Sequence, residues 1–120
     1  MAAGTATITE TTHTGVKKIK VAWTSGSGGE SAAATTTHAY DGKLISLTTI
    51  PTDGPTDNYD VTATDGDGVD VLLGAGANRD TSNTETVAEA SLGAVAGSRL
   101  TFTIANAGTS KSGTAYLYIR

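Results

Sequence analysis

The chain has 120 residues, a net charge of −4 at pH 7 and a sequence pI near 4.9. This length suits one domain with a modest core, and the acidity argues against nucleic-acid binding, which requires a basic surface. The chain contains no cysteine, which excludes disulfides, thiol catalysis and zinc sites that use cysteine.

Alternation of apolar and polar residues predicts strands along most of the chain. Thr, Ala and Gly supply nearly half of the residues, a composition that favours short strands joined by tight turns. Residues 84–92 also carry helix formers, so a short helix is an alternative there. In chain order, strands are predicted at residues 5–13, 17–24, 34–40, 43–50, 58–65, 69–73, 84–92, 99–106 and 112–120.

The connections carry turn residues. Residues 25–29 are a Gly/Ser loop, residues 41–42 are an Asp-Gly hairpin turn, and residues 51–57 hold both prolines and are expected to be a loop. We expect no signal peptide, because residues 1–15 have neither a basic nor an apolar region. No run approaches the ~18 apolar residues of a transmembrane helix.

Regular strand spacing predicts an all-β fold: a single-domain antiparallel β-sandwich, jelly-roll-like, with about eight strands. One face of each strand should be buried. Residues 59, 61 and 63 are expected to point inward before the Asp-rich stretch, and residues 69, 71 and 73 after it. The predicted core is Ile19, Val21, Trp23, Ile45, Leu47, Val61, Val71, Leu100, Phe102, Ile104, Leu117 and Ile119.

The Asp-rich stretch from Tyr59 to Gly74, YDVTATDGDGVDVLLG, fits a calcium loop or a hairpin. An EF-hand loop that starts at Asp65 fails at its fifth position, which is Val69, and at its twelfth, which is Gly76. Asp-Gly pairs at residues 65–68 supply the positive φ of a tight turn. A hairpin is therefore favoured, and weak calcium binding that draws on neighbouring aspartates stays open.

No group of residues supports catalysis. His13 and His38 are the only histidines, and neither has a partner at metal-binding spacing. The three lysines between residues 17 and 20 lie within a predicted strand, where a solvated face is favoured over a phosphate site. No serine lies in a G-x-S-x-G motif, and GSGGES lacks the lysine of a phosphate loop. We therefore expect no enzyme activity, no metal and no cofactor.

Two features suggest contact with a partner. Residues 1–14, rich in Thr and poor in bulk, resemble an arm that adds a strand to a neighbour or stays disordered, ahead of a domain at residues 15–120. Tyr116 and Tyr118 alternate with core residues, so they form an interface stripe or are buried in a central strand. The candidate interface comprises Thr5, Thr7, Ile8, Thr9, Thr11, Tyr116 and Tyr118.

The segments VKKIKVAWTS, PTDNYDVTATDGDGVDVLLGAGANR and ANAGTSKSGTAYLYIR resemble small virion proteins of tailed bacteriophages, and most of all capsid decoration, or cement, proteins. The resemblance covers residues 16–120 and is one of general pattern. It implies a β-sandwich made in the host cytoplasm and placed on the outer capsid surface. There it would bridge neighbouring major capsid subunits, as a trimer in preference to a dimer, without nucleic acid or membrane partners.

Two other functions remain open at this point. A tail or head-fibre module would bind host carbohydrate, for which Tyr59 with Asp57, Asn58 and Asp60 is a candidate patch. A calcium-dependent adhesion domain would use the Asp-rich stretch. Fold alone does not choose between these functions, since sandwiches serve many of them.

Overall fold

The computed structural model describes residues 4–31, 33–53, 55 and 58–120. These residues form nine strands and one 3-10 turn, η1 (Glu89–Ser91), and every strand pair is antiparallel. The strands are β1 (Thr5–Thr12), β2 (Lys17–Thr24), β3 (Ala34–Thr35), β4 (Tyr40–Asp53), β5 (Asp60–Thr64), β6 (Glu85–Ala88), β7 (Ala94–Ser98), β8 (Thr101–Ala105) and β9 (Ser112–Ile119).

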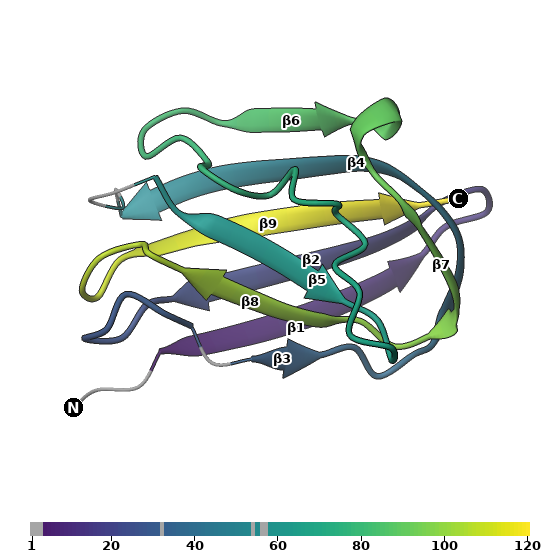
Figure 1. Cartoon of the computed structure of the whole chain (residues 1–120), viewed down its shortest axis with the longest axis horizontal. Coiled ribbons are helices and arrows are strands. Elements are labelled where there is room, and N and C mark those ends of the chain that lie inside the picture. Colours follow the sequence, from purple (N-terminus) through teal and green to yellow (C-terminus); the bar gives the residue numbers. More distant parts are fainter. Residues whose placement is uncertain (1–3, 32, 54, 56–57) are drawn as a thin grey trace.

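The strands form two layers (Figure 1). The larger sheet has the order β1-β2-β9-β4-β6, and β7 pairs with the first part of β4. The smaller sheet has the order β3-β8-β5 and lies in front of the larger one in Figure 1. The predicted antiparallel β-sandwich is confirmed.

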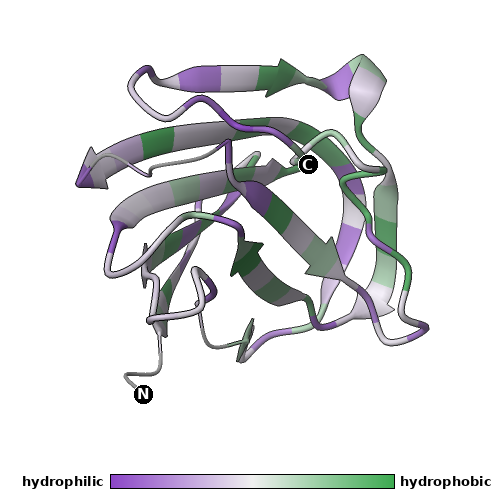
Figure 2. Ribbon diagram, turned by 60° about the vertical axis from the view of Figure 1, so that its left-hand side comes forward, coloured by the Kyte–Doolittle hydropathy of each residue, from purple (hydrophilic) through white to green (hydrophobic). Residues whose placement is uncertain are grey.

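The core lies between the two sheets and is built by the buried apolar side chains of both. Figure 2 shows that apolar and polar residues alternate along many of the strands that contribute to it. Trp23 on β2 packs across the interior against Tyr59, which precedes β5, with ring centroids 5.1 Å apart. The predicted core residues are buried except Ile45, which is half-buried. The alternation of β2, β8 and β9 therefore identified their inner faces correctly.

A β-bulge explains the error at Ile45. Leu44 lies opposite Ile119 on β9 and Ser46 lies opposite Tyr118, so Ile45 is an extra residue in the ladder. The alternation shifts by one position there, and Leu44, not Ile45, occupies the buried site before Leu47.

The Asp41–Gly42 pair is not the predicted hairpin turn. Both residues lie inside β4, at a shift in the register with β7. Gly42 has φ 135°, and a Cβ there would lie 2.3 Å from the Arg120 carbonyl oxygen, so this position uses glycine for backbone conformation and close approach. Strand β4 also extends through Pro51 to Asp53, into the predicted loop, while residues 54, 56 and 57 lie outside the described residues.

The turn at residues 65–68 is observed, but the predicted strand after it is not. The Asp65 N–H donates to the Val69 carbonyl at 3.0 Å, and Gly68 has φ 81°. Only Asp70 then bridges to β5, opposite Thr64, before the chain enters successive turns. Val69 and Leu73, expected to point inward, are 52% and 62% exposed, whereas Val71 and its neighbour Leu72 are buried.

Asp70 causes this change of direction. Its Oδ1 accepts hydrogen bonds from the N–H groups of Ala63 and Leu72, and its Oδ2 accepts one from Gly74. The carboxylate thus stabilises turns where alternation predicted a strand. The segment continues beside β5, bridges Arg79 to Tyr59, and completes the second layer.

Other differences lie at element boundaries. The N-terminal segment is not a separate arm, because residues 5–12 form β1 and pair with β2 over their whole length; residues 1–3 lie outside the described residues. The predicted strand at 84–92 is β6 followed by η1, and the one at 34–40 is reduced to β3 and the start of β4. Strand β7 was not predicted.

Candidate partner-binding face

The solvent-facing side of the larger sheet, which we name the outer face, is built by the side chains that alternate with the core. One cross-strand row joins Thr9, Lys20, Tyr116, Thr48 and Thr86, in the order β1-β2-β9-β4-β6. The adjacent row joins Thr11, Lys18, Tyr118, Ser46 and Ala88. Five neighbouring strands therefore present one continuous polar and aromatic surface.

The structure brings six of the seven candidate interface residues onto this outer face. Thr5, Thr7, Thr9 and Thr11 are exposed on β1, and the tyrosines lie two strands away on β9. Ile8 is the exception, because it faces inward and packs against the core. Its inclusion in the candidate interface is corrected for that reason.

Tyr116 and Tyr118 form an ordered aromatic pair. Their ring centroids lie 6.5 Å apart at an interplanar angle of 16°, and the Lys18 Nζ lies 4.9 Å from the centre of the Tyr116 ring. Each tyrosine is half-buried, so β9 is buried on one face and accessible on the other. The stacked rings and the cation hold this part of the face in place before any partner binds.

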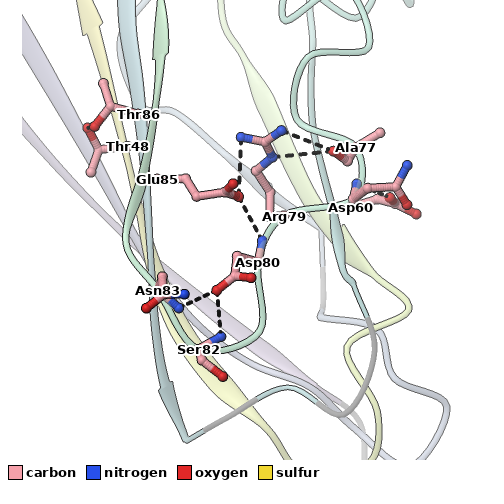
Figure 3. Close-up of polar contacts among 10 residues, drawn as sticks. Thr48, Asp60, Ala77, Arg79, Asp80, Ser82, Asn83, Glu85 and Thr86 are labelled. Carbon is pink, nitrogen blue, oxygen red and sulfur yellow. Dashed lines mark hydrogen bonds and ion pairs between the residues drawn. The ribbon is translucent and has the colours of Figure 1, made fainter.

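Charge is distributed unevenly between the outer face and its borders. Lys18 and Lys20 lie near its centre, while Asp53 lies at one end, opposite Ser112. At the start of β6, Glu85 forms an ion pair with Arg79 at 3.5 Å and accepts a hydrogen bond from the Asp80 N–H (Figure 3). The face is thus locally basic in an acidic chain.

In the loop before β6, the Asp80 carboxylate holds the backbone. The N–H groups of Ser82 and Asn83 donate to Asp80, and these bonds lower the pKa of the Asp80 carboxyl (Figure 3). Thr48 and Thr86 are joined by a hydroxyl–hydroxyl bond of 3.2 Å across β4 and β6. Threonine pairing therefore stabilises this edge of the outer face.

Glu10 ties β1 to the segment that leads into β4 and to Tyr40, the first residue of β4. Its carboxylate accepts hydrogen bonds from the N–H groups of Thr37 at 2.9 Å and His38 at 3.1 Å, and from the Tyr40 hydroxyl at 2.7 Å. Burial raises the pKa of Glu10, but these hydrogen bonds outweigh it and the net shift is downward. Burial and the hydrogen bond to Glu10 raise the pKa of Tyr40.

Replacement of Glu10 by glutamine is expected to lower the free energy of unfolding at pH 7 by about 1 kcal/mol, since the charge-assisted bonds are lost at a partly exposed site. Because the folded pKa is depressed, this stabilisation is present above pH 4.5 and is lost as the pH falls through the folded pKa. Urea unfolding should show a smaller difference in the free energy of unfolding between wild type and Glu10→Gln at pH 3 than at pH 7. Glu30→Gln, at an exposed carboxylate, is the control; an equal loss there would contradict this role.

Other residues singled out in the sequence do not assemble into a site. His13 and His38 are exposed, and within the described part of the chain no group of His, Asp and Glu side chains could hold a metal ion. The Asp65 Oδ1 accepts hydrogen bonds from the N–H groups of Asp67 and Val69. Tyr59 is fully buried, which removes it from the candidate carbohydrate patch, and Asp57 lies outside the described residues.

Several members of the outer face were not among the predicted interface residues, including Lys18, Lys20, Thr48 and Thr86. The alternation of these residues with core residues can be read from the sequence. The pairing of β9 between β2 and β4, which places them beside the tyrosines, cannot be read from it.

No family model matches the chain, and no curated protein matches it. Among solved structures, the chain is similar to a cupin domain from Bordetella pertussis Tohama I, with 15% identity, a TM-score of 0.41, and coverage of 100% of this chain and 98% of that one. None of the helical structure in the described residues is long and apolar enough to cross a membrane.

Proposed function

We propose that this chain is a non-enzymatic virion structural protein that decorates a phage capsid by bridging neighbouring major capsid subunits through the outer face. The observation that carries the proposal is the convergence of Tyr116, Tyr118 and Lys18 with the threonines of β1 on one side of one sheet. The resemblance of the sequence to decoration proteins supplies the partner.

The composition of the outer face suits protein binding. Tyrosine gives a large contact area with few rotatable bonds, and threonine is stiff at χ1, so little side-chain entropy is lost on binding. A partner that complements Lys18 and Lys20 would carry carboxylates opposite them. A decoration protein works by surface alone, since separating two bridged subunits must also break its contacts, and many copies on a lattice act together.

Replacing Tyr116 by alanine is expected to weaken binding to assembled capsids by at least tenfold, because a central interface tyrosine typically contributes about 2 kcal/mol or more. The measurement is co-sedimentation of the purified protein with undecorated capsids. Val69→Ala, which truncates an exposed apolar side chain in the turn after β5, should bind like wild type.

Unassembled major capsid protein provides the second arm of this experiment. A composite site exists only after assembly, so binding to free subunits should be much weaker than binding to capsids. Equal binding to both would contradict the bridging mechanism. Retention on host cells, lost with Tyr116→Ala and without any capsid binding, would instead assign the outer face to a carbohydrate-binding fibre module.

A further inference from the structure

Strand β1 is a long edge strand whose one charged side chain, Glu10, is bound within its own chain. Its eight residues pair with β2 in one uninterrupted register, and its outer side has no strand partner among the described residues. Natural edge strands commonly carry lysine, proline or a bulge that discourages further pairing. The β1 sequence TATITETT has none of these features.

The hydrogen-bond pattern shows which backbone groups face outward. At the β1–β2 turn, the His13 N–H donates to the Val16 carbonyl at 2.8 Å. Because bonded and non-bonded pairs alternate along an antiparallel ladder, Thr5, Thr7, Thr9 and Thr11 direct their N–H and C=O groups toward β2. The intervening residues therefore direct theirs away from the sheet, and within the described chain these outward groups have no partner. They are Ala6, Ile8, Glu10 and Thr12.

We propose that β1 pairs antiparallel with β1 of a second copy of the chain, about a two-fold axis at Thr9. This register sets Ala6 opposite Thr12 and Ile8 opposite Glu10 of the other copy. All four outward-facing residues then form hydrogen-bonded pairs. A shift of the register by two residues would leave some of these backbone groups unpaired.

Side chains on the outer face favour the same register. Thr9 would face Thr9 of the other copy, and Thr7 would face Thr11. The protein already joins threonines across antiparallel neighbours, between Thr35 and Thr101 at 2.9 Å and between Thr48 and Thr86 at 3.2 Å.

The lysines of the outer face do not oppose this dimer. Lys20 lies on β2, directly opposite Thr9 of β1. The two β1 strands would therefore separate the Lys20 residues of the two copies, which would lie three strand spacings apart, about 14 Å. That distance exceeds the Debye length of ~8 Å at physiological salt. The two Glu10 residues would be diagonal neighbours across the new strand pair, and each carboxylate is already held by the Thr37 and His38 N–H groups and the Tyr40 hydroxyl of its own copy. The two outer faces would join into one surface with two tyrosine pairs. This two-fold arrangement differs from the trimer that the resemblance favours.

The test uses the absence of cysteine from the chain. Residues opposite each other at a non-hydrogen-bonded pair lie ~4.5 Å apart between Cα atoms, which a disulfide can span. On mild oxidation of the purified full chain, Thr9→Cys should therefore form a covalent dimer roughly tenfold faster than Thr7→Cys or Thr11→Cys alone. Each of those controls would place its own cysteines about 14 Å apart.

A mixture of Thr7→Cys and Thr11→Cys should cross-link as fast as Thr9→Cys, because those positions face each other in the proposed register. Sedimentation of the wild type should give a mass twice that of the 12.0 kDa chain. The Thr9→Lys variant should sediment with the mass of a single chain. Equal cross-linking of the three single variants, or a monomer at every concentration, would overturn the proposal. A dimer that persists in Thr9→Lys would place the interface elsewhere. These measurements do not involve capsids, so they do not depend on the proposed function.

Discussion

Truncation of Phe102 to alanine is expected to lower the free energy of unfolding by about 3–5 kcal/mol. Phe102 lies on β8, the middle strand of the smaller sheet, and is 1% exposed. Its cross-strand neighbours are Ala63 on β5 and Ala34 on β3. Because both neighbours are small, neither of them has the volume to fill the cavity that the ring would leave.

The measurement is urea unfolding of wild type, Phe102→Ala and Phe102→Leu. Leucine retains most of the volume, so that variant should lose less than about 1.5 kcal/mol. A domain of this size has only about 5–15 kcal/mol of stability, so Phe102→Ala should also shift the thermal midpoint by many degrees. A loss below about 1 kcal/mol would show that the ring is not a main element of the core.

Addition of a single methyl group at Gly113 is expected to cost about 3 kcal/mol, at the upper end for overpacking. Gly113 lies on β9 between Trp23 on β2 and Pro51 on β4. A Cβ at this position would lie 2.7 Å from the Trp23 Cζ2 and 2.8 Å from the Ile50 carbonyl oxygen. The indole would have to move within a filled core, and the carbonyl belongs to the backbone of a central strand.

A double-mutant cycle with Trp23→Phe separates these two contacts. The smaller ring removes the Cζ2 contact, so the cost of Gly113→Ala should be lower in that background than in wild type. The Trp23 Nε1 makes no hydrogen bond within the described chain, so Trp23→Phe loses volume and no polar contact. Equal costs in the two backgrounds would show that the carbonyl, not the indole, limits this position. No cost in either background would contradict the close packing.

Alternation predicted the fold wherever strands are regular. The inner faces of β2, β8 and β9 follow directly from residues such as Val21, Ile104 and Leu117, because a period of two fixes which side is buried. Prediction failed where one residue breaks the period. The bulge at Ile45 shifts β4 by one position, and no residue type marks that bulge in the sequence.

The candidate site could not be predicted from local sequence patterns alone. Val69 and Leu73 alternate as strand residues do, but hydrogen bonds to Asp70 turn the chain and leave both side chains exposed. The threonines of β1 and the tyrosines of β9 are separated by about a hundred residues, and they share a face only because β9 lies two strands from β1. Strand order of this kind is a property of the whole chain.

The central position of β9 has a consequence for synthesis. This strand lies between β2 and β4, so the larger sheet remains split into two halves until residues 112–119 have left the ribosome. Chains emerge at about 5–20 residues per second, and during that time the edges of β2 and β4 that pair with β9 have no partner strand. The nascent chain must therefore remain incompletely folded until this strand is released, and folding then joins segments far apart in sequence, a slow class of event.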